Sequence, residues 1–421
     1  MPSSCLGFRG PLPMRRCRQA ILLALAGCLL VACGGEPTPA ASPTTVTAPV
    51  VDPLPEAPLE GALKIAAIFP VYGRFGISGE ESHRGVRLAV EDWRERVGRP
   101  VRELQVLEYR TGSDPQDVRE AARQASRAGA LAIVGSNASR LSQSIAEFAQ
   151  IHSIPMVSNV STVLDLTMDP ETGRNREFIF RVCHNDRVMG RFLAECARID
   201  LKAKSAAVLY DVSRPYSVNL ADTFDETFRE SDSTRDVTRF YYGPLETDFR
   251  RQLRAIRELD PDVLFVPGSF IDASLIAEQA ETIGLRATLL GGDSWSNKLL
   301  FKRKPPSRPV YHADHWFSGG PFRDLYVERY GTEPNGGRAA LAYDAFSVIA
   351  HALSNLGNLT ERNLTSGVAH TRDRLRRAIA LGLWEGVTGT ITFDRFGDPP
   401  QKGVIVKLHK GARTLFKDLE D

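Results

Sequence analysis

Short apolar runs alternate with amphipathic segments through most of the chain. The apolar runs are residues 63–69, 103–109, 130–135, 154–158, 178–182, 205–211, 237–243, 262–268 and 287–293. Between them, apolar side chains recur at helical spacing over 82–96, 115–128, 139–152, 186–199, 215–230, 247–259 and 272–284. Buried strands that alternate with helices predict an α/β fold with parallel sheets flanked by helices. One sheet with all of these strands would be unusually wide, so we expect two lobes.

The first 32 residues have a different pattern, which is typical of an export signal. They contain four Arg and no acidic residue, followed by the uncharged run 20–32. That run is shorter than the roughly 20 apolar residues that span a bilayer, but it suits the apolar region of a signal peptide. It ends at Ala32-Cys33, which resembles a bacterial lipobox. We therefore predict a signal peptide over 1–32 and lipidation at Cys33. The alternative is a signal anchor with an incidental Cys, and translation can start at Met1 or Met14.

Residues 33–61 hold this Cys and a Pro-rich stretch with seven Pro and no aromatic residue. Such a stretch cannot bury enough apolar surface to offset its ordering entropy. It predicts an extended tether that holds a folded body near a membrane face.

Removal of the signal changes the charge and the cysteine count. The whole chain has 53 basic and 51 acidic residues, and the loss of four Arg leaves 49 against 51, a net charge near −2. A balance this close to zero argues against a nucleic-acid partner. Three of the six Cys lie in the signal and Cys33 is expected to carry lipid, so Cys183 and Cys196 remain in the body. They either form a disulfide or stay free, and positions at a strand end and late in a helix favour buried free thiols.

Polar and aromatic residues gather where the predicted strands end. Ligands of open parallel sheets bind at the carboxyl ends of the strands. Hydroxyls and free N–H groups at a helix start suit a carboxylate, and an acid on the facing lobe suits an ammonium. Together these groups would clamp a zwitterion, and aromatic side chains would cover its apolar part. The candidate residues are Tyr72, Ser139, Ser161, Thr162, Tyr216, Phe270, Asp293 and Trp295.

Each candidate also has a plainer interpretation. The hydroxyl residues could be helix caps, Asp293 could be a turn residue, and Tyr72 could be a core or rim aromatic. His312 and His315 have metal-ligand spacing, but their stretch is strand-like, so we predict no metal site. The basic run 302–304 is interpreted as a solvated loop. The sequence lacks the common nucleophile-elbow, phosphate-loop, dinucleotide and metalloprotease motifs, so we predict neither an enzyme nor a cofactor.

Six stretches, in order along residues 63–415, carry a resemblance to a known family. They are LKIAAIFPVYG with GEESHRGVRLAVEDW, LEYRTGSDPQDVREAARQ, AIVGSNASRLSQSIAEFAQIHSIPMVS, VLYDVSRPYSVNLADTF, RELDPDVLFVPG and GVTGTITFDRFGDPPQKGVIVKLHKGA. In this order and spacing the chain resembles the leucine/isoleucine/valine-binding proteins of bacterial ABC importers. The stretch TGTITFDRFGD is the most specific.

The resemblance implies the type I periplasmic-binding-protein fold, with two Rossmann-like lobes joined by three hinge crossovers. Lobe 1 would comprise 62–181 plus 315–398, and lobe 2 would comprise 182–314 plus 399–421. The lobes would close on one ligand between them.

The resemblance also assigns roles to residues. Ser139, Ser161 and Thr162 would bind the ligand carboxylate, Asp293 would bind its ammonium, and Tyr216 would close over it.

Three departures from the family pattern concern the pocket. Ser78 stands where an aromatic residue is common, and Phe270 replaces a usual Tyr. Ser113 and Ala138 occupy the positions of a disulfide found in similar proteins.

The implied function is a monomeric, lipid-anchored solute-binding protein of the periplasm or cell envelope. It would capture a small amino acid or related ligand and deliver it to an ABC permease. Two alternatives stay open on the same fold: a ligand sensor or regulator of an envelope enzyme, and a binder of a larger apolar or lipid ligand, since Ser78 widens the pocket.

Overall fold

The computed structural model describes residues 62–97, 103–230, 236–356, 367–400 and 402–420. The predicted signal peptide, Cys33 and the Pro-rich tether lie outside the described residues. None of the helices in the described ranges combines the length and the apolar character needed to cross a bilayer.

The first sheet has five parallel strands in the order β2-β1-β3-β4-β5. Its strands are β1 (Leu63–Pro70), β2 (Leu104–Thr111), β3 (Ala132–Val134), β4 (Met156–Ser158) and β5 (Ile179–Arg181). Alternate side chains of β1 point to opposite faces, as strand geometry requires. Ile65, Ala67 and Phe69 pack with one set of helices, and Ala66 and Ile68 pack with another.

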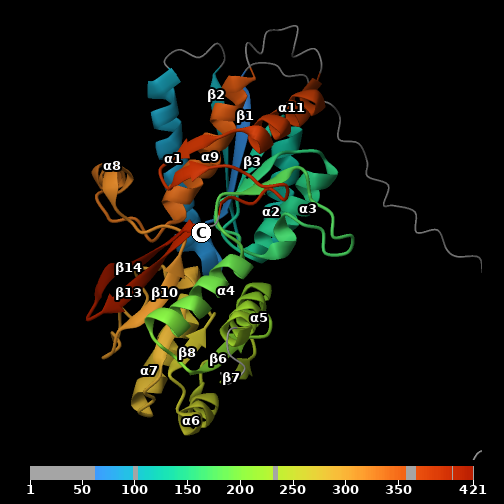
Figure 1. Ribbon diagram of the computed structural model, residues 1–421. Coiled ribbons are helices and arrows are strands. Elements are labelled where there is room, and N and C mark those ends of the chain that lie inside the picture. The colour runs from blue at the N-terminus through green and yellow to red at the C-terminus, as the bar shows by residue number, and fades with distance from the viewer. Residues whose placement is uncertain (1–61, 98–102, 231–235, 357–366, 401, 421) are drawn as a thin grey trace, which may run out of the picture. The chain divides into compact units, whose positions relative to one another are not determined.

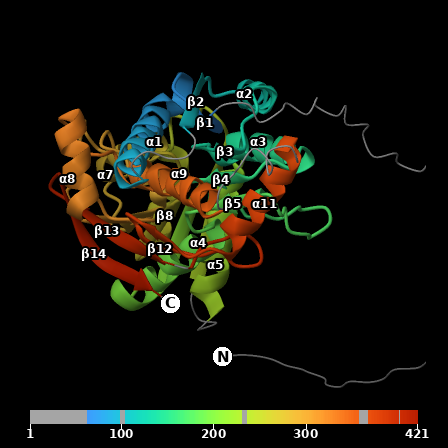
Figure 2. The ribbon, with the colours of Figure 1, turned by 90° about the horizontal axis from the view of Figure 1, so that it is seen from above.

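Helices cover both faces of this sheet. On one face lie α1 (Gly76–Val97), α9 (Arg338–Asn355) and α11 (Gly367–Leu381), and on the other lie α2 (Pro115–Arg127) and α3 (Ser139–Ile151). Figure 2 shows α1 and α9 on one side of the strands and α2 and α3 on the other.

The second sheet has the order β14-β13-β10-β9-β8-β6-β7, and Figure 1 labels all of these strands except β9. Its strands are β6 (Ser205–Asp211), β7 (Asp236–Tyr242), β8 (Val263–Val266), β9 (Thr288–Gly291), β10 (Val310–Asp314), β13 (Lys402–His409) and β14 (Ala412–Glu420). The strands β6 to β10 are parallel, as predicted. At one edge β13 and β14 are antiparallel, which the strand and helix pattern did not predict.

Helices also cover both faces of the second sheet. Val208 and Phe265 pack with α4 (Asp186–Glu195) and α5 (Pro215–Glu230). Leu209, Leu264 and Val266 pack on the other face with α6 (Arg250–Leu259) and α7 (Phe270–Thr282). The remaining elements are η1 (Gly73–Phe75), η2 (Leu164–Leu166), the π-helical turn η3 (Cys196–Asp200), η4 (Asp293–Trp295), α8 (Gly320–Tyr330), β11 (Trp384–Gly386) and β12 (Gly389–Ile391).

The chain passes between the two sheets three times. It leaves the first sheet after β5, returns after β10 to place α8, α9 and α11 in the first core, and leaves again before β13. Parallel sheets flanked by helices, with three crossovers, confirm the predicted α/β fold class.

Helix α1 begins at Gly76, six residues before the predicted start. Residues 76–81, which lie between the predicted strand 63–69 and the predicted helix 82–96, are therefore part of the helix. At Gly79 an added Cβ would lie 1.7 Å from the carbonyl oxygen of Pro70, so only glycine lets the helix approach the strand end this closely. Cys183 and Cys196 are free and buried, as their predicted positions favoured.

Candidate functional site

The clearest contact among the predicted site residues joins Asp293 and Tyr216. Asp293 opens η4, directly after β9, and Tyr216 lies in the first turn of α5, which follows β6. The Tyr216 hydroxyl donates a hydrogen bond of 2.9 Å to Oδ1 of Asp293. Ser294 links the same region to the end of β8, because its hydroxyl donates to the carbonyl of Gly268 at 2.6 Å. Three parallel strands of the second sheet thus end at one polar cluster.

The surroundings of Asp293 favour its charged form. Burial alone would raise the pKa of this carboxyl, but the imidazole of His315, the charge of Arg338 and the Tyr216 hydrogen bond together hold the pKa below its ordinary value. Nε2 of His315 lies 3.7 Å from Oδ2 of Asp293. Burial and the nearby Asp293 charge raise the pKa of Tyr216, so its hydroxyl stays a donor.

A second buried acid, Asp186, belongs to this cluster and was not predicted. It is the first residue of α4, and its backbone N–H donates to the carbonyl of Thr162 at 2.8 Å. The amide of Asn219 donates to its carboxyl group at 3.3 Å, and the nearby Thr162 hydroxyl also favours the charged form of that carboxyl group. Burial, with a smaller contribution from the Asp293 charge, raises the pKa of Asp186 to about 7.

The signal that could have identified Asp186 is its place in the chain. Asn185-Asp186 comes shortly after the strand 179–181, separated from it by the segment 182–184, where the second lobe was predicted to begin. The Asn185 side chain accepts from the N–H of Val188 at 3.1 Å, so it caps α4 and leaves Asp186 free for other contacts.

On the side of the first sheet, the predicted hydroxyls have different surroundings. Ser139 is half-buried at the first position of α3, and the preceding Ala138 makes no side-chain cap bond. The N-terminal amides of α3 are therefore not capped by that side chain. The Ser161 hydroxyl instead points inward, where it bonds the Ser136 carbonyl at 3.2 Å and contacts the Ser142 hydroxyl.

Arg181 holds the loop that carries Ser161 and Thr162. Its side chain is fully buried, and Nη1 donates to the carbonyls of Ser161 at 3.0 Å and Val163 at 2.9 Å. Nε lies 2.6 Å from Oδ1 of Asp398, which precedes β13. Asp398 also accepts from Asn185 at 2.8 Å. Two of the three passages between the sheets are thereby tied to the loop after β4.

A third group of residues lies around the end of β1. Tyr72 is 64% exposed, which excludes the core interpretation of this aromatic. The neighbouring Arg74 reaches the second sheet's helices, since Nη2 donates to Ser269 Oγ at 3.3 Å and lies 3.7 Å from Asp272. Phe270, the first residue of α7, is half-buried beside that contact. Sequence reasoning did not identify Arg74.

The predicted residues thus fall into separate groups. Asp293 and Tyr216 are in direct contact, and Thr162 joins them through Asp186. Ser78 is half-buried in the first turns of α1, before the predicted start of this helix at residue 82. Trp295 is fully buried in the second core.

Comparison with known proteins agrees with this architecture. The sequence model of the family described as periplasmic binding protein matches residues 62–412. Over 255 residues, 60% of this chain and 67% of the relative, the chain is 27% identical to the Leu/Ile/Val-binding protein BraC3 of Rhizobium johnstonii.

Solved structures give the same result. The leucine-binding protein LivK of Thermotoga maritima superimposes with a TM-score of 0.75 at 27% identity, covering 85% of this chain and 99% of that one. LivJ of Streptococcus pneumoniae, solved with isoleucine, superimposes with a TM-score of 0.72 at 20% identity, covering 85% of this chain and 100% of that one. At this identity the likeness concerns the fold alone. The chain therefore belongs to the periplasmic binding protein family.

Proposed function

We propose that this chain is a lipid-anchored solute-binding protein of the periplasm. It captures a small amino acid or a related ligand between two lobes and delivers it to an ABC importer. Lobe 1 is 62–181 plus 315–398, and lobe 2 is 182–314 plus 399–421. The family match and the leucine-binding relatives support this class of function.

The observation that carries the proposal is the pair of buried carboxyls, Asp293 and Asp186. Burial, with a smaller contribution from the Asp293 charge, raises the pKa of Asp186 to about 7, whereas Asp293 is held in its charged form. A bound ammonium would stabilise both charges at once. The Tyr216 hydroxyl, which donates to Asp293, fixes the carboxylate in one orientation.

The ligand carboxylate would lie at the side of the first sheet. The start of α3 at Ser139 offers backbone N–H groups and the positive end of the helix dipole. Helix α3 contacts α5, the helix that begins next to Tyr216, so the two ends of a zwitterion can be bound by elements that already meet. We place the hydroxyl of Ser161 at this end as a support of the loop, whereas Thr162 contacts Asp186 at the ammonium end.

Tyr72 and Phe270 would cover the apolar part of the ligand, and Ser78 would leave room beside it. Arg74, which bridges to Ser269, would close the entrance.

Calorimetric titration of the purified protein with each of the twenty amino acids tests the proposal. We expect saturable binding of at least one, and its loss in Asp293→Ala, because removal of one partner of a buried charge pair costs roughly 2–5 kcal/mol. Asp324→Asn, an exposed acid of α8 with a side chain 73% exposed, is the matched control.

No heat with any amino acid, or unchanged affinity in Asp293→Ala, would overturn the assignment. Native mass spectrometry of the protein as purified then separates the alternatives. A lipid adduct indicates a binder of apolar ligands, and an empty protein indicates a sensor or regulator without a small ligand.

The anchor has its own test. Cys33→Ser should release the protein from the membrane fraction and abolish incorporation of a labelled fatty acid, while the amino-acid titration stays unchanged. A Cys33→Ser protein that remains membrane-bound and labelled would contradict the anchor alone.

A further inference from the structure

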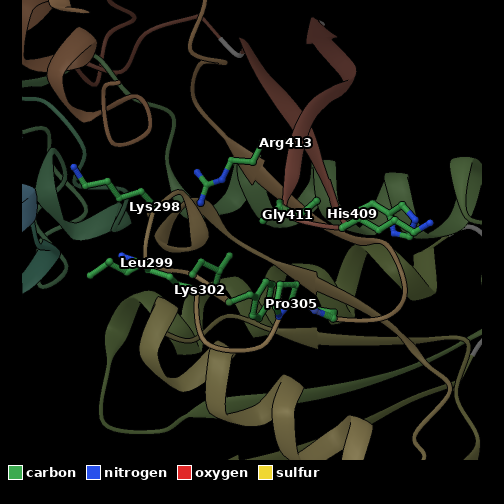
Figure 3. Close-up of a pocket in the computed structure, with 12 residues that line it drawn as sticks. Lys298, Leu299, Lys302, Pro305, His409, Gly411 and Arg413 are labelled. Atoms are coloured by element: carbon green, nitrogen blue, oxygen red, sulfur yellow. The ribbon is translucent and has the colours of Figure 1, made fainter. Parts of the chain in front are cut away.

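A hollow of about 410 Å³ lies between the segment 298–306 and the turn that joins β13 to β14. Figure 3 shows side chains from both segments around it. None of the predicted ligand-binding residues lines it. Its volume falls within the range of roughly 300–1,000 Å³ that is usual for small-molecule pockets.

The charged groups of the hollow are all basic. Lys298, Lys302 and Lys410 are exposed, and Arg413 is half-buried. Among its twelve lining residues, all in the described part of the chain, there is no Asp or Glu. Four positive charges around one space repel one another, and an anion would relieve that repulsion.

The backbone and one hydrogen bond fix two of these cations. Lys410 and Gly411 have φ values of 51° and 80°, which is a two-residue turn with both residues left-handed and places Lys410 at its tip. The guanidinium of Arg413 donates to the carbonyl of Asn297 and so spans from the hairpin to the opposite wall. Nδ1 of His409 is buried and has no hydrogen-bond partner among the described residues.

The floor of the hollow is apolar. Leu300, Phe301 and Leu408 are buried side chains that line it, and Leu299 and the ring of Pro306 are half-buried beside them. A ligand of this site would therefore bury an apolar part against the floor and keep its charge at the rim, since burial of apolar area is favourable and burial of an unpaired charge is not.

The geometry points to a second binding site, for an amphiphilic anion: a phosphate or carboxylate group on an alkyl or aryl chain. Lys298, Lys302, Lys410 and Arg413 hold the anionic group, and the apolar floor holds the chain. Of the basic run 302–304, which the sequence presents as a solvated loop, Lys302 thus contributes to one wall of a pocket. The anion can come from a free metabolite or from the headgroup region of an anionic bilayer, which share this chemistry.

The test titrates the whole purified protein with octyl phosphate below its micellar concentration, and with inorganic phosphate and octyl glucoside. We expect octyl phosphate to bind at least about tenfold more tightly than either comparison compound, because only it supplies both charge and chain. Comparable binding of octyl glucoside, or no binding of octyl phosphate, would overturn the proposal.

Two double variants show where the anion binds. The double variant Lys302→Glu, Lys410→Glu should bind octyl phosphate at least about tenfold more weakly than the parent protein does. Arg251→Glu with Arg254→Glu changes the net charge equally on the exposed side of α6 and should leave affinity within about twofold. An equal loss in both would indicate a general charge effect and overturn the site. Melting temperature verifies that each variant is folded.

Co-sedimentation with vesicles of phosphatidylglycerol and phosphatidylcholine identifies the source of the anion. Binding to anionic vesicles that is lost in the Lys302→Glu, Lys410→Glu protein supports the bilayer. Octyl phosphate binding without vesicle binding supports a free amphiphile. Neither result depends on amino-acid binding, so this site and the proposed function fail separately.

Discussion

Nε of Arg181 lies 2.6 Å from Oδ1 of Asp398, and this ion pair joins the end of β5 to the segment that enters β13. The Arg181 side chain is fully buried and also bonds two carbonyls of the loop after β4. One guanidinium thus connects two passages between the sheets and the loop that carries Thr162.

The first prediction concerns this pair. Asp398→Ala leaves a buried guanidinium without its counter-charge, so we expect the free energy of unfolding to fall by about 3–5 kcal/mol. Chemical denaturation followed by circular dichroism measures the change. Asp248→Ala breaks the exposed pair with Arg250, whose side chains are 59% and 56% exposed, and should cost less than about 1 kcal/mol. An equal loss of unfolding free energy in Asp398→Ala and Asp248→Ala would show that burial of the Arg181 pair does not increase its contribution to stability.

The second prediction concerns the hydroxyl of Tyr216. Tyr216→Phe keeps the ring and removes the 2.9 Å donor to Asp293. Loss of a hydrogen bond to a charged group costs roughly 1.5–3 kcal/mol, so ligand affinity should fall about 10-fold to 100-fold. Tyr241 is an exposed residue of β7, so Tyr241→Phe should bind the ligand as tightly as the parent protein does. If Tyr216→Phe and Tyr241→Phe bind the ligand with equal affinity, Tyr216 does not contribute to the binding site.

The third prediction is a pH dependence of stability. The pKa of Asp186 is about 7 in the folded state, mainly because of burial, and about 4 in an unfolded chain. The folded state therefore binds more protons between these values, and the contribution of this group to stability is lost as the pH rises from about 4 to about 7.

Asp186→Asn removes this titration. Relative to the parent, the ligand-free variant should gain roughly 2–4 kcal/mol of unfolding free energy between pH 4.5 and pH 7.5. Urea unfolding at the two pH values measures it, with Asp324→Asn as the control. If Asp186→Asn and the parent differ in unfolding free energy by the same amount at both pH values, the pKa of Asp186 is not raised.

The fourth prediction concerns the contact between Arg74 and α7. Arg74 Nη2 is 3.3 Å from Ser269 Oγ and 3.7 Å from Asp272, and its side chain is 38% exposed. A contact of this exposure contributes up to about 1 kcal/mol. Arg74→Ala should therefore weaken ligand binding about twofold to fivefold, chiefly through a faster dissociation rate in stopped-flow measurements. Arg94→Ala, on the exposed side of α1, should leave the rate unchanged.

Much of the fold could be predicted because its strands are continuous apolar runs. The strand 205–211 and the helix 215–230 agree with the prediction at both ends, and the short turn 212–214 separates them. The start of α1 was misplaced because Gly76 and Gly79 suggest a turn, whereas here they permit close packing. The antiparallel edge was not predicted, because strand direction at β13 depends on its partner β10.

The site was predicted only in part, for a related reason. Asp293 and Tyr216 follow strand ends, where local pattern and the general rule for parallel sheets agree. Asp186 and Arg181 act through partners that the fold brings together from distant segments. Arg181 and Asp398 are separated by 217 positions, and no periodicity connects them.

The antiparallel pairing of β10 with β13 has a consequence for biosynthesis. Val310 pairs with Leu408 and Asp314 pairs with Val404, so one edge of β10 stays open until residues 404–408 have been made. The sheet that carries Asp293 cannot be completed on the ribosome while its C-terminal strands are still in the exit tunnel. The export that we propose for this chain would benefit from this delay, because the unfinished sheet keeps the chain open to translocation.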